Sequence, residues 1–281
     1  MSADIFGSQP ADEDRLAELY DLEHDGLVED LPFYRELARR VDGPVLDLGC
    51  GSGRLFRTLL DAGASRILGL DGSAALLRRA EARIAADEGL AQAARDGRLS
   101  VMRGDVRAIS TLNIRERFDL VVAVGVLPHL DGPEDALRLL GGTRSVLAKG
   151  GRLVIDDLGP AEMPVRDMPL SIDWRRQMDG REVVRRSELV RRESPEGLRV
   201  AFSTIADAVQ PDGTIARLPA SHRLWYPSPE ALAALVKQAG MVVDLSYGSH
   251  DLEPLGRESG RRIYVVAYEF AAAPSHEVRV G

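Results

Sequence analysis

The sequence predicts an α/β protein with a doubly wound parallel sheet and an antiparallel β cap inserted after the fifth strand. Short apolar runs alternate with longer helical patterns from Val45 onward, which is typical of parallel strands joined by crossover helices. A glycine-rich turn at 49–53 directly follows the first of these runs. After Asp157 the alternation stops, and the segment 158–226 separates the fifth run from the next clear helical pattern.

Five segments are apolar enough to be strands buried on both faces of a sheet. They are VLDL (45–48), RILGL (66–70), LSVMR (99–103), FDLVVAV (118–124) and GRLVIDD (151–157). The clearest helix between them is 73–86, where Ser73 is a suitable N-cap and apolar residues recur along one face. Ahead of the first strand, 12–22 and 31–40 also have helical patterns.

The inserted segment contains one clear pair of antiparallel strands. Apolar or small residues occupy every second position over 198–208, the sequence PDG at 211–213 favours a turn, and 214–226 can return as the paired strand. The pattern at 181–192 fits neither period, so helix and strand are equally expected there.

The C-terminal part is expected to complete the core. Ser228 opens a helix that reaches Gly240, with Pro229 at its first position, and strands are expected near 241–247 and 262–269. These patterns divide the chain into a helical lid (1–43), a ligand-binding core (44–157), the cap (158–226), a completion of the core (227–270) and a flexible tail (271–281).

Composition favours an ordinary soluble protein of the cytoplasm. Hydrophobic residues make up 44% and charged residues 28% of the chain. The opening MSADIFGSQPADEDR has acids and lacks an apolar core behind a basic start, so no secretory signal is expected. The longest apolar stretch, 120–127, is far shorter than the roughly 20 residues of a membrane span. The single cysteine, Cys50, excludes an internal disulfide and fits a reducing compartment.

Charge and histidine spacing exclude further classes of partner. A net charge of -8 would repel a phosphate backbone, so nucleic acid is not the expected partner. The five histidines, at 24, 129, 222, 250 and 276, lack the spacing of metal ligands, so no metal site is expected. No stretch indicates a partner surface, and the chain is expected to be a monomer or a homodimer.

The glycine turn suits a ligand that approaches the main chain closely. Gly49, Gly51 and Gly53 permit positive φ and leave no Cβ in the way. A dinucleotide-binding turn reads G-x-G-x-x-G, whereas here Arg54 fills the sixth place, so the register does not fit NAD. Asp47 would repel a pyrophosphate and attract an ammonium or sulfonium centre. A tight strand-to-helix turn without a ligand is the alternative.

Two further acids follow the second and third predicted strands. Asp71 lies about 20 residues after the glycine turn, the position of a carboxylate that accepts hydrogen bonds from ribose hydroxyls. Asp105, with the amide of Val106, could satisfy the amino group and ring nitrogen of adenine. Either acid could instead stabilise a turn or cap a helix. Acids at the carboxyl ends of three successive strands are a stronger signal than any one of them.

The motifs VLDLGCGSGR, ILGLDGS, RGDVR, FDLVVAVGVLPHL and LAKGGRLVIDD together resemble class I S-adenosylmethionine-dependent methyltransferases. The resemblance covers about 31–157, and the late strands resemble the closing antiparallel pair of this family. It implies a Rossmann-like sheet of seven strands and S-adenosyl-L-methionine (SAM) as the cofactor. The glycines would lie along its methionine part, Asp71 at the ribose, Asp105 near the adenine, and the backbone of Val124 and Gly125 at the methionine ammonium.

The opening helices resemble those of small-molecule members, in which an N-terminal helix folds over the cofactor. Tyr20 would then contact the cofactor as part of a lid, although plain packing is the alternative. The expected cofactor-binding residues are Tyr20, Asp47, Gly49, Cys50, Gly51, Gly53, Arg54, Asp71, Gly72, Ser73, Asp105, Val106, Val124 and Gly125.

His129 is the leading candidate for a catalytic base. A nitrogen or oxygen acceptor that still carries a proton would benefit from such a base. His129 follows the fourth strand, at the carboxyl edge of the sheet, and resembles a histidine found at this point in sugar N-methyltransferases and related natural-product enzymes. Contact with the substrate and a structural hydrogen bond are the alternative roles.

The cap is expected to supply the acceptor pocket through its large rings, with core packing as the alternative for each. The expected substrate-binding residues are Trp174, His222, Trp225 and Tyr226. The sequence thus predicts SAM-dependent methyl transfer to nitrogen or oxygen, and less readily to carbon, of a small molecule, in keeping with secondary metabolism. A SAM-binding scaffold without activity, an NAD-linked reductase and a nucleic-acid methyltransferase are the alternatives.

Overall fold

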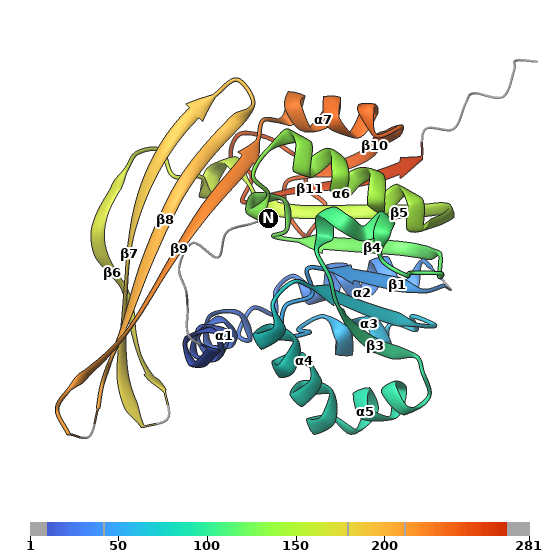
Figure 1. Ribbon diagram of the computed structural model, residues 1–281. Coiled ribbons are helices and arrows are strands. Elements are labelled where there is room, and N and C mark those ends of the chain that lie inside the picture. Colours follow the sequence, from blue (N-terminus) through green and yellow to red (C-terminus); the bar gives the residue numbers. More distant parts are fainter. Residues whose placement is uncertain (1–9, 42, 179, 211, 269–281) are drawn as a thin grey trace, which may run out of the picture.

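The computed structural model describes residues 10–41, 43–178, 180–210 and 212–268, which form two β-sheets (Figure 1). In the larger sheet, the first five strands run parallel and the last two are antiparallel to their neighbours. In spatial order its strands are β10 (Met241–Tyr247), β11 (Arg261–Tyr268), β5 (Leu147–Leu158), β4 (Phe118–Val124), β1 (Val45–Leu48), β2 (Ile67–Asp71) and β3 (Leu99–Arg103). The predicted Rossmann-like sheet of seven strands is confirmed.

Helices cover both faces of this sheet, because side chains of a buried parallel strand point alternately to either side. Leu46 belongs to one apolar cluster, which includes Leu139 and Leu232, whereas Val45 belongs to a second cluster, which includes Phe56. The helices are α2 (Leu31–Arg39), α3 (Phe56–Asp61), α4 (Ala74–Ala86), α5 (Glu88–Arg95), α6 (Pro133–Val146) and α7 (Pro229–Gln238), with short 3-10 helices η1 (Val106–Thr111), η2 (Leu127–His129) and η3 (Pro160–Glu162).

The cap is a separate antiparallel sheet that stands beside the core (Figure 1). Its strands, in order, are β6 (Met168–Met178), β7 (Arg181–Ser194), β8 (Gly197–Val209) and β9 (Ile215–Pro227). The segment at 181–192, for which helix and strand were equally expected, is a strand. Sequence analysis did not predict β6, an edge strand whose register with β7 shifts twice and whose residues follow no two-residue period.

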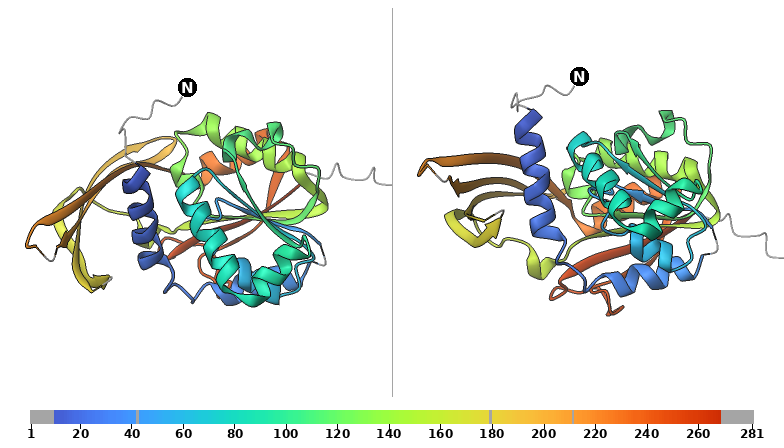
Figure 2. Two further views of the ribbon diagram at one scale, coloured as in Figure 1. Left: turned by 60° about the horizontal axis from the view of Figure 1, so that its bottom comes forward. Right: turned by 90° about the horizontal axis from the view of Figure 1, so that it is seen from below.

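Helix α1 (Pro10–His24) lies between the cap and the core (Figure 2). Leu19 packs in a small apolar cluster with residues of the cap. On the core side, Asp21 and Asp25 form ion pairs with Arg79 and Arg83 of α4. The helix therefore connects the two sheets, although it belongs to neither.

Two predictions concern residues outside the described ranges: the flexible tail at 271–281, and Pro211 in the predicted turn. Within the described ranges, no helix is both long and apolar enough to span a membrane.

Asp156 joins several elements behind the carboxyl edge of the sheet. This residue of β5 is fully buried, and its carboxylate accepts hydrogen bonds from the Tyr34 hydroxyl of α2, from His250 Nε2 at 2.8 Å and from Arg261 Nε at 2.8 Å. Burial alone would raise its pKa, but the hydrogen bond from His250 and the charge of Arg261 outweigh burial, so the pKa is lowered. The ionised carboxylate is thus the form that holds these elements together.

Asp156→Asn is expected to lower the free energy of unfolding by about 3 kcal/mol, because removing one partner of a buried ion pair leaves the other without compensation. Urea denaturation at pH 7 measures this. Asp244→Asn is the control: Asp244 is half exposed, pairs with Arg152 at 3.3 Å and should cost less than about 1 kcal/mol. Equal effects of the two substitutions would contradict the role of Asp156 in holding these elements together.

Candidate functional site

A cavity of about 450 Å³ lies at the carboxyl ends of β1, β4 and β5. The glycine turn contributes Gly49, and the ends of β4 and β5 contribute Val124 and Asp157. Tyr20 comes from α1 and Tyr226 from the cap. Residues of the core, of α1 and of the cap therefore line one cavity.

The glycine turn has the conformation that its residues predict. Gly49, Gly51 and Gly53 have φ of 72°, 56° and 80°, the left-handed region that favours glycine. The amide of Gly49 donates to the carbonyl of Leu70 at 2.7 Å, which fixes the turn to β2. A Cβ at Gly49 would lie 2.7 Å from a methyl carbon of Val126. No larger residue fits there without displacing its neighbour.

Asp47 is the unsatisfied carboxylate of this turn. It is 3% exposed, lines the cavity, and its Oδ2 has no hydrogen-bond partner among the described residues. Burial raises its pKa to about 7, partly opposed by the charge of Arg54. A buried carboxylate without a partner suits a cationic ligand, which would supply the missing charge. The residues present therefore fit the sulfonium and ammonium groups of SAM.

Tyr20 lies over the glycine turn, where a lid residue was predicted. A Cβ at Gly51 would be 2.9 Å from its hydroxyl oxygen, and its ring stacks on that of His24 with centroids 4.0 Å apart. Burial raises its pKa to about 12, with a further contribution from the charge of Asp71. Arg54 holds the segment after α1 in place through two hydrogen bonds to Asp30, of 2.8 and 2.6 Å.

Asp71 is bound to the main chain at the end of β2. Its carboxylate accepts hydrogen bonds from the amides of Gly51 at 2.9 Å and Ser73 at 2.8 Å. These bonds align the two turns, and each oxygen has capacity for a further hydrogen bond. Asp71 is not among the residues lining the cavity, so its ribose contact stays a prediction.

Asp105 is bound by Arg107, two positions later in the chain. It accepts from the amide of Arg107 at 2.8 Å and from two guanidinium nitrogens, at 2.9 and 2.7 Å, and so caps η1. This is the capping role named as its alternative. Arg107 would have to move for Asp105 to meet an adenine amino group, and that contact also stays a prediction.

His129 lies in η2, directly after β4, and lines the cavity. Part of its side chain reaches solvent, yet the surrounding protein still desolvates the imidazole, which lowers its pKa, and His222 lowers the pKa further. The two rings meet edge to face, with centroids 6.1 Å apart. Among the described residues, no hydrogen bond to the His129 ring is found. The imidazole is therefore neutral at pH 7 and available to accept a proton.

The cap rings divide between this cavity and other surroundings. Tyr226 lines the cavity, and His222 lies beside His129 without lining it. Trp225 is 1% exposed and packs in the core. Trp174 packs near α1, with the guanidinium of Arg176 5.0 Å from its ring centroid.

The cavity separates the predicted cofactor residues into two groups. Those that line it are Tyr20, Asp47, Gly49, Cys50, Arg54, Val124 and Gly125. Those that do not are Gly51, Gly53, Asp71, Gly72, Ser73, Asp105 and Val106. Asp157, His250 and Arg261 also line it and were not predicted. Asp157 could have been found, because it lies at the carboxyl end of a predicted strand, near which Asp47 and Asp71 also lie.

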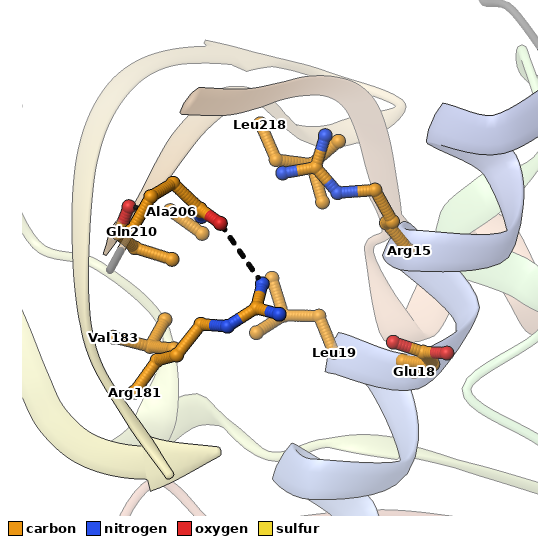
Figure 3. A pocket seen from close by; sticks show the side chains of 9 residues that line it. Arg15, Glu18, Leu19, Arg181, Val183, Ala206, Gln210 and Leu218 are labelled. Carbon is orange, nitrogen blue, oxygen red and sulfur yellow. Dashed lines mark hydrogen bonds between the residues drawn. The ribbon is translucent and has the colours of Figure 1, made fainter. Parts of the chain in front are cut away.

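A smaller cavity of about 90 Å³ lies between α1 and the cap (Figure 3). Arg15 and Glu18 of α1 face it from one side, and Arg181, which donates to Gln210 at 3.1 Å, from the other. It contains none of the predicted site residues. In the described part of the chain, no group of three or more potential ligands is placed to hold a metal ion.

Comparison with known proteins connects this site to a family. Residues 45–151 match the methyltransferase domain family. A tRNA U34 carboxymethyltransferase of Shewanella amazonensis is 38% identical over 114 residues, which are 41% of this chain and 31% of that protein. The mitochondrial ubiquinone biosynthesis O-methyltransferase of Dictyostelium discoideum is 25% identical over 114 residues, 41% of this chain and 35% of that protein. The chain thus spans about a third of the length of these relatives.

Solved structures match over nearly the whole chain and show the fold. A SAM-dependent methyltransferase from Clostridium acetobutylicum has a TM-score of 0.71 at 18% identity, with 91% of this chain and 98% of that chain covered. Streptomyces venezuelae DesVI has a TM-score of 0.68 at 20% identity, covering 90% and 98%. The sugar N-methyltransferase KedS8 from Streptoalloteichus has 0.67 at 20% identity, covering 89% and 93%. Residues 45–151 thus match a methyltransferase domain, and the chain has the fold of these solved methyltransferases.

Proposed function

We propose that this protein transfers the methyl group of SAM to a nitrogen or oxygen atom of a small molecule. The observation that carries the proposal is that one cavity contains both an unsatisfied buried carboxylate, Asp47, and a neutral imidazole, His129. A cationic cofactor needs the first group, and an acceptor that loses a proton needs the second.

The residues of the turn would hold the cofactor. Asp47 would pair with a cationic group, the main chain around Gly49 would follow the methionine part, and Tyr20 would cover it from α1. When bound, SAM supplies a methyl group on a positively charged sulfur, which needs little further activation. The protein's main contribution is then alignment of the acceptor, which can be worth roughly 7 to 11 kcal/mol.

His129 would accept the proton that a nitrogen or oxygen acceptor loses. Its lowered pKa keeps the imidazole in the basic form at pH 7, and its position after β4 places it at the same edge as Asp47. Tyr226 of the cap and Tyr20 of α1 line the cavity on other sides. A general base of this kind typically contributes 10² to 10⁴ in rate.

A small molecule is the better supported acceptor. The cavity volume, about 450 Å³, is within the range of small-molecule sites. A net charge of -8 opposes binding of a phosphate backbone. The two curated relatives differ in acceptor, and one of them is named for tRNA. A solved structure of the same fold is named a sugar N-methyltransferase, a protein named for a small acceptor.

SAM or its demethylated product, S-adenosylhomocysteine, is expected to bind more tightly as the pH rises from about 5.5 to about 7.5. The pKa of Asp47 in the free protein is raised to about 7, and only the ionised carboxylate attracts a cation, so affinity should increase until this group is ionised. Asp47→Asn should weaken binding about tenfold or more and remove the pH dependence. Calorimetry with S-adenosylhomocysteine measures both, and Asp244→Asn is the control. A pH dependence that survives Asp47→Asn would rule out this role.

His129→Ala is expected to lower kcat by 10² to 10⁴ while the affinity for S-adenosylhomocysteine stays within about twofold. The wild-type rate should fall at low pH as the imidazole becomes protonated, and this fall should be absent in the variant. Transfer of labelled methyl groups to a panel of small amines and alcohols provides the assay. Turnover that is unchanged in the variant would remove the base role.

Small molecules, and not RNA, are expected to take up the label from radioactive SAM. Incubation with a bacterial small-molecule extract and, separately, with total RNA, followed by chromatography, distinguishes the two classes. Salt-dependent labelling of RNA alone would overturn the small-molecule proposal. Binding of NAD in place of SAM would overturn methyl transfer itself.

A further inference from the structure

Asp157 is a carboxylate of the cavity that neither the fold nor the cofactor site uses. It stands at the carboxyl end of β5, is 3% exposed and lines the cavity. Its Oδ1 has no hydrogen-bond partner in the part of the chain that the structure describes. The adjacent Asp156, by contrast, accepts hydrogen bonds from three other side chains. Neighbouring residues of a strand point to opposite faces, so these three hydrogen bonds do not reach Asp157.

The charged groups around Asp157 do not neutralise it. Arg262 is its register partner on β11, but Nε of this arginine donates to the carbonyl of Leu158 at 3.1 Å and Nη1 to that of Pro227 at 2.8 Å. No ion pair to Asp157 is found among the described residues. Burial raises its pKa to about 7, opposed by the charges of Arg262 and Arg261 and reinforced by that of Asp156. Tyr226 of the cap, whose own pKa Asp157 raises, is the titratable group facing it from β9.

Asp157 is also distinct from the cofactor carboxylate. Asp47 is the penultimate residue of β1 and Asp157 that of β5, and β4 lies between these two strands in the sheet. Asp47 is in register with Val122 of β4, which is in register with Val154 of β5. Asp157 therefore lies three residues farther along its strand than Asp47 and on the opposite face of the sheet. His129 follows the intervening strand, β4. The edge thus presents a carboxylate, the proposed base and a second carboxylate in that spatial order.

We propose that Asp157 forms a second cation subsite in this cavity, which binds a protonated amine of the methyl acceptor. This inference rests on the proposed function and narrows its substrate class to amines. If the bound nitrogen itself receives the methyl group, the ammonium must first lose a proton, which His129 would accept, because only the neutral amine has a free electron pair. An ammonium supplies both the charge and the hydrogen-bond donors that Asp157 lacks, whereas a hydroxyl supplies a donor only. A buried carboxylate therefore binds an ammonium in preference to a hydroxyl.

The test compares benzylamine with benzyl alcohol, two probes of similar shape of which only the amine is charged at pH 7.5. Calorimetry is done on the full chain saturated with S-adenosylhomocysteine. Benzylamine is expected to bind at least about tenfold more tightly than the alcohol, with a Kd in the millimolar range. Asp157→Asn should abolish this preference without changing the affinity for S-adenosylhomocysteine, and Asp244→Asn, on the exposed part of the same sheet, should keep it.

Equal affinity for the two probes, a preference that survives Asp157→Asn, or no saturable binding of either probe would overturn the inference. If S-adenosylhomocysteine binds wild type normally in those cases, the proposed function stands and only the amine subsite fails. If it does not bind wild type at all, the proposed function fails as well.

Thermal unfolding gives a readout that needs no acceptor. The pKa of Asp157 is higher in the folded than in the unfolded chain, so its contribution to stability is present below about pH 4 and is lost as the pH rises to about 7. Asp157→Asn should therefore raise the unfolding midpoint at pH 8 and leave it nearly unchanged at pH 4. A lower midpoint at pH 8 would indicate a structural role and overturn the subsite.

Discussion

The site depends on a main-chain turn that has no room for side chains. Between β1 and α3 the chain runs through residues with positive φ, with Val126 against one glycine and Tyr20 against the next. Asp47 is buried beside this turn, and its Oδ2 has no hydrogen-bond partner among the described residues. A buried carboxylate oxygen without a donor favours a cationic ligand in the cavity.

Parts of the chain that are distant in sequence complete this turn. Tyr20 reaches it from α1, Tyr226 from the last strand of the cap, and Arg261 from the start of β11. Asp156 fixes the edge behind the cavity by joining α2, β5 and β11. The parallel sheet thus sets where the strands end, and the flanking elements decide how the space above those ends is closed.

The sequence predicted the parts of the fold that follow from local patterns. The parallel strands have continuous apolar runs, and Ser73 caps α4 by accepting from the amide of Leu76 at 3.2 Å. β6 was not predicted, because an exposed edge strand needs no alternation of polar and apolar residues. The segment at 181–192 was ambiguous for a related reason: in β7 only some of its inward positions are buried, so its period is weak.

The candidate site was predicted where chemistry is tied to the ends of strands, and not where it depends on tertiary contacts. Asp47 and His129 line the cavity as expected, since both follow directly from the positions of β1 and β4. The sequence does not show that Arg107 binds Asp105, because the side chain of an arginine two positions away can point in several directions. Trp225 is in the core because alternation along β9 turns it away from the side that Tyr226 presents to the cavity.

Arg83 of α4 connects the glycine turn to α1. Its Nε donates to the carbonyl of Ser52 in the glycine turn at 2.9 Å, and its Nη2 binds Asp25 at the end of α1 at 2.6 Å. One guanidinium thus binds both the glycine turn and α1. If a ligand bound at the turn shifts the position of α1, the position of α1 must change the affinity for that ligand by the same factor.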